Sequence, residues 1–157
     1  MKPFDTIKNR GMPVFLLAVS FALLSPWIAV QARSAESPLE QSPGIVQGET
    51  KQGFAYMSGG VGIDERELMG KLGKAYNLKL SFAEISGPYL ADVGLIIEDT
   101  KGAEIISTTT NGPWFYIQLP SGAYTIKATV GGNTKQIKNL QLSKGERISR
   151  TVHWDLD

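Results

Sequence analysis

The sequence predicts a mainly β protein, an antiparallel β-sandwich of about seven strands with one N-terminal amphipathic helix. From residue 78 onward, apolar and polar residues alternate with a period of two, as in strands that are buried on one face. Turn sequences rich in Gly, Pro and Asn interrupt this alternation about every eight to twelve residues, a spacing typical of sandwiches and barrels. No alternation of strands with helices supports a parallel sheet.

The N-terminal segment, residues 1–32, has the pattern of a secretory signal peptide. Three basic residues precede the apolar run VFLLAVSFALLSPWIAV, and Val30 and Ala32 occupy the two small positions before a cleavage site. The run is at the short end for a membrane span, which needs roughly 20 apolar residues. We expect cleavage after Ala32, export to the periplasm or the medium, and no membrane span afterwards. The alternative is an uncleaved membrane anchor.

The composition limits the classes of partner. The chain has 16 basic and 15 acidic residues, and removing the three basic residues and one acidic residue of the signal segment leaves a net charge near −1. Such a balance gives no electrostatic reason to bind nucleic acid or an anionic membrane. The chain has no cysteine, so an exported domain must be stabilised by a packed core without disulfides.

Residues 33–60 are predicted to be a flexible linker, because the stretch 33–53 is rich in Pro, Ser, Gly, Glu and Gln. Its end, FAYMSGGVG (54–62), is a short apolar patch followed by glycines. Two alternatives stay open for this patch: an added edge strand, or a segment docked on the domain. The folded domain, helix and sandwich together, is expected over residues 61–157.

One helix is predicted over residues 64–76. Asp64 fits the N-cap and Glu67 completes a capping box, while Ile63 and Leu68 are placed to form a hydrophobic staple. The apolar stripe at helical spacing consists of Leu68, Leu72, Ala75 and Tyr76. Asn77 is a suitable C-terminal stop.

The expected strands cover residues 78–83, 90–99, 104–110, 114–119, 123–130, 134–142 and 147–154. The clearest alternations put one face of each strand toward the core. These inward residues are Leu78, Leu80 and Phe82, then Val93, Leu95 and Ile97, and finally Tyr124, Ile126, Ala128 and Val130.

Four motifs after Tyr89 follow one family pattern: EDTKG, STTTNG, WFYIQL and LPSGAYTIKAT. With them, residues 89 to about 154 resemble a carboxypeptidase regulatory-like domain. That resemblance implies a transthyretin-like (prealbumin-like) β-sandwich and an accessory role: such domains help folding, attach to enzymes or receptors, or bind proteins and glycans. The upstream stretch 58–84 lies outside that domain and resembles the front end of small exported bacterial proteins of unassigned function.

No set of residues for catalysis stands out. His153 is the only histidine, and no Gly-x-Ser-x-Gly elbow presents a nucleophile, so His153 is interpreted as structural. One histidine and no cysteine exclude an ordinary zinc site, and the carboxylates of IDERE and EDTKGAE lack the spacing of a calcium loop. We predict no enzyme activity, no metal and no cofactor.

The triplet Trp114-Phe115-Tyr116 raises the main functional question. Simple alternation turns Phe115, Ile117 and Leu119 to one face and Trp114 and Tyr116 to the other. The resemblance instead implies that Trp114 and Tyr116 point inward, and a bulge before Leu119 would reconcile the two. Either way both faces are apolar. We favour a strand with the core on one face and the helix on the other, because soluble monomers rarely expose large apolar patches.

These observations predict a non-catalytic exported module, periplasmic or secreted, that acts by protein–protein interaction with an envelope protein. The alternative is a carbohydrate-binding module for envelope or extracellular glycan. Its aromatic platform would be built from Trp114, Tyr116 and Tyr89, because exposed rings stack on sugars.

Overall fold

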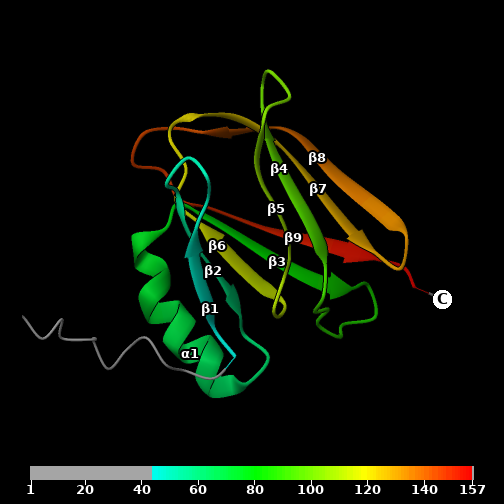
Figure 1. The fold of residues 1–157 in the computed structure, drawn as a ribbon. Coiled ribbons are helices and arrows are strands. Elements are labelled where there is room, and N and C mark those ends of the chain that lie inside the picture. The colour runs from blue at the N-terminus through cyan, green and yellow to red at the C-terminus, as the bar shows by residue number, and fades with distance from the viewer. Residues whose placement is uncertain (1–43, 157) are drawn as a thin grey trace, which may run out of the picture. The chain divides into compact units, whose positions relative to one another are not determined.

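The computed structural model describes residues 44–156. The predicted signal peptide (1–32) and residues 33–43 of the predicted linker lie outside the described residues. Two β-sheets of five and four strands and one short helix make up the described part (Figure 1). The prediction of a mainly β, sandwich-like fold with one helix is confirmed.

The five-stranded sheet contains, in spatial order, β1 (Val46–Glu49), β2 (Ala55–Gly59), β6 (Trp114–Ile117), β3 (Leu78–Glu84) and β9 (Ile148–Trp154). The four-stranded sheet contains β5 (Glu104–Thr109), β4 (Gly94–Asp99), β7 (Gly122–Val130) and β8 (Asn133–Leu142). Helix α1 (Ile63–Leu72) continues into the 3-10 turn η1 (Gly73–Ala75). Paired strands are antiparallel, except that β9 runs parallel to β3.

The main hydrophobic core lies between the two sheets and follows the predicted alternation. β3 contributes Leu78, Leu80 and Phe82, each at most 1% exposed. The remaining predicted inward residues belong to the same cluster, with Val130 partly buried: Val93, Leu95, Ile97, Tyr124, Ile126, Ala128 and Val130. Burying one such large apolar side chain stabilises the fold by about 1.5–3 kcal/mol. The inward faces predicted for these three strands are therefore confirmed.

Residues 46–59 form two strands, which corrects the linker prediction for this part of 33–60. β2 pairs with β1 on one side and with β6 on the other, so the patch 54–62 contains an interior strand and β1 is the edge. The sequence VQGE has no alternation that would identify β1 as a strand. Backbone pairing with β2 holds β1 in place instead. The described residues thus hold nine strands, where the sequence predicted about seven.

Helix α1 begins at Ile63, with Gly62 as its N-cap and no side-chain cap. The predicted capping box of Asp64 and Glu67 is wrong. Glu65, in the third helical position, instead accepts hydrogen bonds from the N–H groups of Gly60 and Val61, at 3.1 and 3.0 Å. The predicted staple is also wrong, because Ile63 is 68% exposed. A glutamate that reaches back to the preceding backbone stabilises this helix start.

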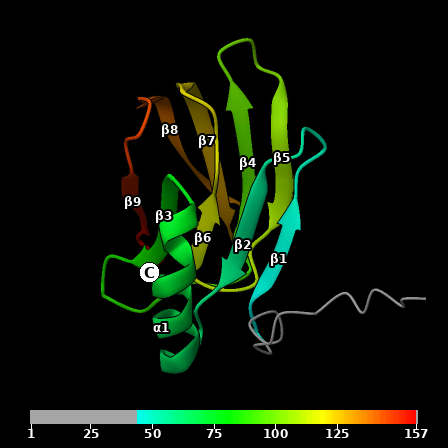
Figure 2. The same cartoon turned by 90° about the vertical axis from the view of Figure 1, so that its left-hand side faces the viewer.

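The helix packs on the outer face of the five-stranded sheet, opposite the main core (Figure 2). Met69 is fully buried there against Met57 of β2 and Tyr116 of β6, with Leu72 and Tyr76 partly buried beside them. The buried face of the helix therefore differs from the predicted stripe. Met69, which was not in that stripe, lies at the centre of the buried face, and Ala75, which was, is exposed. Within residues 44–156, no helix is long and apolar enough to cross a membrane.

The segment that resembles a regulatory-like domain, 89–154, does not contain a complete sandwich. It supplies β4 to β9, yet β6 lies between β2 and β3, and β9 pairs with β3. The upstream residues therefore complete the five-stranded sheet rather than preceding a separate domain.

Candidate functional site

The aromatic strand β6 has two covered faces. Phe115 and Ile117 are fully buried in the main core, whereas Tyr116 is 7% exposed and packs under α1. Its pairing with β2 and β3 runs without a register shift from Trp114 to Ile117. Simple alternation, with the helix as cover, is thus confirmed, and the inward placement of Trp114 and Tyr116 taken from the resemblance is wrong.

The three predicted platform residues do not form one flat row. The rings of Trp114 and Tyr116 meet edge to face, with centroids 6.4 Å apart and an interplanar angle of 69°. Trp114 is half-buried, and Tyr89, in the loop after β3, is 53% exposed. The Arg66 guanidinium stands over the Tyr89 ring at 5.7 Å. Of the three side chains, Tyr89 is the most exposed, with Arg66 over one face of its ring.

Lys79 of β3 lies beside Trp114 and Tyr116, a contact that the sequence did not predict. Its Nζ lies 3.3 Å from the centroid of the Trp114 ring and 5.4 Å from that of Tyr116. Burial lowers the pKa of Lys79, because the charged ammonium loses water. The ring face of Trp114 offsets part of this cost through a cation–π interaction. Among the described residues, no carboxylate lies within salt-bridge distance of Lys79, since the ion pair found there joins Lys127 to Glu98.

A small pocket of about 150 Å³ opens beside Lys79, between η1 and β9. Five of the residues that line it are Gly73, Tyr76, Tyr116, Arg147 and Ile148. The Arg147 guanidinium donates a hydrogen bond to the carbonyl oxygen of Lys74. Burial raises the pKa of both Tyr76 and Tyr116, so their hydroxyls stay protonated. The pocket thus combines two cations, two phenol donors and no acidic residue, a donor set suited to an anion.

A second hollow, of about 350 Å³, lies between the β1–β2 hairpin and β5. Tyr56 and Ile105 contribute apolar surface, and Glu49, Lys51 and Glu104 add charges. The Tyr56 ring is stacked on Phe115 of the core, with centroids 5.6 Å apart. This hollow therefore has one rigid aromatic wall next to an edge strand.

Within residues 44–156, β5 pairs with β4 alone. At the start of its other edge, the Glu104 carbonyl oxygen accepts a hydrogen bond from Gln52 Nε2 at 3.1 Å, so the open part of this edge begins at Ile105. The Thr110 N–H donates to the Val93 carbonyl oxygen, and hydrogen-bonded pairs alternate along an antiparallel ladder. The N–H groups of Ser107 and Thr109 consequently point away from β4. Glu104 is the one charged residue of β5, and from Ile105 to Thr110 the edge carries none of the charged side chains that commonly block strand addition.

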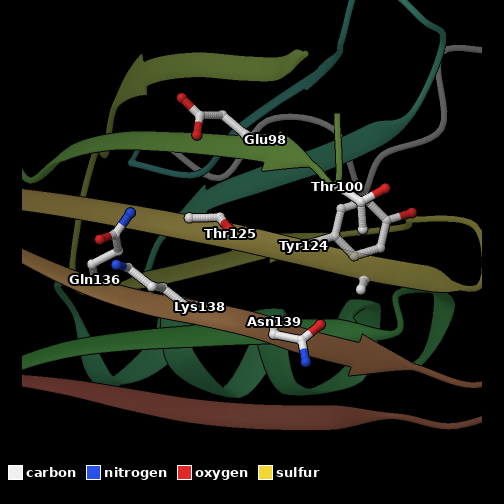
Figure 3. A pocket seen from close by; sticks show the side chains of 8 residues that line it. Glu98, Thr100, Tyr124, Thr125, Gln136, Lys138 and Asn139 are labelled. Carbon is white, nitrogen blue, oxygen red and sulfur yellow. The ribbon is translucent and has the colours of Figure 1, made fainter. Parts of the chain in front are cut away.

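A third hollow, also of about 350 Å³, lies on the outer face of the four-stranded sheet (Figure 3). Glu98, Gln136 and Lys138 project there from β4 and β8. The Tyr124 hydroxyl, at its other end, donates to the Pro120 carbonyl oxygen at 2.8 Å. Glu98 is already paired with Lys127 at 2.7 Å, so its carboxylate is engaged outside this hollow.

The residues considered for chemistry stay apart. His153 is exposed on β9, on the face opposite the buried Trp154. In the described range 44–156, no group of three or more His, Cys, Asp or Glu side chains is placed to hold a metal ion. Sequence reasoning missed Lys79 and Arg147, because neither belongs to a motif and a lysine between two buried leucines is ordinary for a strand with an exposed face.

Comparisons with protein-family models, curated proteins and solved structures find no match to this chain.

Proposed function

We propose that this chain is an exported, non-catalytic β-sandwich module that binds an extended segment of an envelope protein along β5. Export follows from the predicted signal peptide, with the periplasm or the medium as destination. The proposal includes the transthyretin-like, carboxypeptidase regulatory-like character inferred from the motifs after Tyr89, because domains of that family serve as accessory binding modules. The lack of a catalytic motif in the sequence favours binding over chemistry.

The open edge of β5 is the observation that carries this proposal. An added partner strand would pair with the outward-pointing N–H groups of Ser107 and Thr109, and would compete with the Thr108 hydroxyl for the Thr109 carbonyl oxygen. Its alternate side chains would reach the hollow beside Tyr56 and Ile105. In recognition by strand addition, main-chain hydrogen bonds supply affinity and side-chain pockets supply specificity. Both requirements are present on this one edge.

The other edges are less suitable for strand addition. β1 is only four residues long and ends in Glu49. On the far side of the sandwich, Trp154 Nε1 of β9 donates to the Asn133 carbonyl oxygen of β8 at 3.0 Å, which draws those two edges together. β8 and β9 also carry charged residues, including Lys138 and Arg150, which oppose edge-to-edge pairing.

Site-specific photo-crosslinking in the native host tests this proposal. A photoreactive residue is placed at Thr109, on the β5 edge, and in a control strain at Lys138, an exposed position on β8. We expect one envelope protein to crosslink from position 109 and not from 138. The crosslinked peptide should be an extended segment.

A proline substitution provides the matched test of backbone pairing. Ser107→Pro removes a donor that points away from β4, so the sheet itself is expected to survive, as at other edge prolines. The crosslink should disappear in Ser107→Pro and persist in Ser107→Ala. Equal crosslinking by both variants would show that the β5 backbone does not bind the partner.

Carbohydrate binding is the second proposal, and the exposed ring of Tyr89 favours it. It would replace the first if no protein crosslinks from either position and the purified protein is retained on immobilised envelope glycan. Retention should then be lost in Tyr89→Ala, whereas Tyr56→Phe, at the β5 hollow, should keep it.

A further inference from the structure

We infer that the pocket between Tyr76 and Arg147 binds a small carboxylate with a flat apolar body, whose charge is held by Lys79 and Arg147. This pocket lies on the five-stranded sheet, away from the β5 edge, so the inference is independent of the proposed strand addition.

Lys79 is a partly desolvated cation that has no anionic partner within residues 44–156. Its ammonium rests on the Trp114 ring, and no carboxylate of the described residues lies within 4.0 Å. A desolvated charge without a counter-charge is unfavourable. An anion entering the pocket would supply that counter-charge and would gain a charge-assisted hydrogen bond from the ammonium.

Three further side chains that line the pocket carry hydrogen-bond donors: Arg147, Tyr76 and Tyr116. Arg147 has five N–H donors, and its bond to the Lys74 carbonyl leaves others for a ligand. The phenols of Tyr76 and Tyr116 line the pocket and are protonated at neutral pH, where a tyrosine of ordinary pKa is already neutral, so both can donate. A carboxylate accepts several hydrogen bonds at once, which matches the number of donor side chains that line the pocket.

The size and the walls of the pocket narrow the ligand class. A volume of about 150 Å³ is below the roughly 300–1,000 Å³ of typical ligand pockets, so the pocket suits only a small ligand. The rings of Tyr76 and Tyr116, with centroids 6.1 Å apart and tilted by 57°, form apolar walls together with Ile148. A benzoate-like acid combines the required charge with a flat apolar body.

The competing explanation is purely structural. Lys79 would then only cover Trp114, and Arg147 would only bind the carbonyl end of η1. In that case both side chains matter for stability, but no anion should depend on Lys79 for binding. Lys79→Met separates the two explanations, because methionine keeps an apolar stem over the ring and removes the charge.

The test is an amide-proton NMR titration of the purified protein with sodium benzoate. Benzyl alcohol, which has the same ring without the charge, and sodium phosphate, which has charge without the ring, serve as comparison ligands. We expect saturable shifts with benzoate that concentrate at residues 73–79, 116 and 147–149. Neither comparison ligand should saturate in the same range.

Lys79→Met should weaken benzoate binding about tenfold or more, the effect of losing one charge-assisted hydrogen bond. The control Lys138→Met, on an exposed strand position of the other sheet, should leave it unchanged. If Lys79→Met fails to fold, Arg147→Gln is the second variant and should also weaken binding. Absence of saturable shifts, shifts away from the pocket, equal saturation by phosphate, or unchanged affinity in the folded variant would overturn the inference.

Discussion

At the scale of single residues, Tyr116 links the packing of the helix to the chemistry of the pocket. Its ring closes a cluster with Met57 and Met69, while its side chain also lines the pocket beside Lys79. Burial raises the pKa of Tyr116 above the usual 10.0, because a buried phenolate loses its hydration. The same burial that fits the ring beneath α1 therefore keeps its hydroxyl a hydrogen-bond donor.

This shift makes the fold sensitive to alkali. As the pH rises above 10.0, the unfolded chain releases the Tyr116 proton while the folded chain retains it, so unfolding becomes more favourable up to the folded-state pKa. One tyrosine changes the free energy of unfolding by at most about 1.4 kcal/mol per pH unit in this window. Tyr116→Phe removes this contribution, and Tyr76 and Tyr124, whose pKa values are also raised, retain theirs.

Urea unfolding on either side of pH 10.0 measures the effect. Below pH 10.0, wild type and Tyr116→Phe should differ only by the small cost of the lost hydroxyl. Above it, the stability of the wild type should fall more steeply than that of the variant. Parallel losses in both proteins would mean that Tyr116 ionises as readily in the folded state as in the unfolded chain.

At the scale of elements, two glycines of the helical segment have opposite roles. A Cβ at Gly73 would lie 2.5 Å from Tyr116 Cε1, whereas a Cβ at Gly70 would meet nothing within 4 Å. Gly73 has a helical backbone, so its substitution is limited by this contact and not by its dihedral angles. The 3-10 turn can therefore approach β6 closely only where no side chain intervenes.

We expect Gly73→Ala to destabilise the protein by about 1–3 kcal/mol, the usual cost of overpacking. Gly70→Ala is the matched control and should stabilise it by about 0.5–1 kcal/mol, because alanine is the better helix former at an exposed position. Thermal and denaturant unfolding of both variants check the signs. A stabilising Gly73→Ala would mean that η1 moves away from Tyr116 at little cost.

The strands whose inward faces could be predicted are those in which apolar and polar residues alternate strictly with a period of two. β3, β4 and β7 each alternate over several residues, so their inward faces could be assigned from sequence. β1 could not, because its stability comes from pairing with β2 rather than from its own composition. The start of α1 was misplaced for a similar reason: Glu65 binds the backbone of Gly60 and Val61, while Asp64 resembles a cap without acting as one.

At the scale of the whole molecule, the pocket could not be predicted because distant segments build it. Lys79 and Arg147 are brought to the same pocket by the parallel pairing of β3 with β9 and by the turn before β9. No local pattern encodes that pairing. The triplet Trp114-Phe115-Tyr116 was foreseeable as a strand with two covered faces, since the helix stripe needed an apolar surface to cover.

The same long-range pairing predicts where the folding unit begins. A fragment of residues 89–156 contains all the motifs that resemble a regulatory-like domain, yet it lacks β2 and β3. In it, β6 would lose both neighbours and β9 its neighbour β3. The loss of Leu78, Leu80 and Phe82 alone removes about 1.5–3 kcal/mol each, comparable with the 5–15 kcal/mol that typically separates folded from unfolded proteins.

We therefore expect the fragment 89–156 to be unfolded or aggregated, and the fragment 44–156 to unfold cooperatively. Far-UV circular dichroism with urea unfolding, together with binding of a hydrophobic dye, distinguishes the two states. A third fragment, 61–156, lacks only β1 and β2 and leaves one side of β6 unpaired, so it should fold with reduced stability. A cooperative transition in 89–156 would instead show that the motif-bearing segment folds by itself, with the upstream strands added to a complete domain.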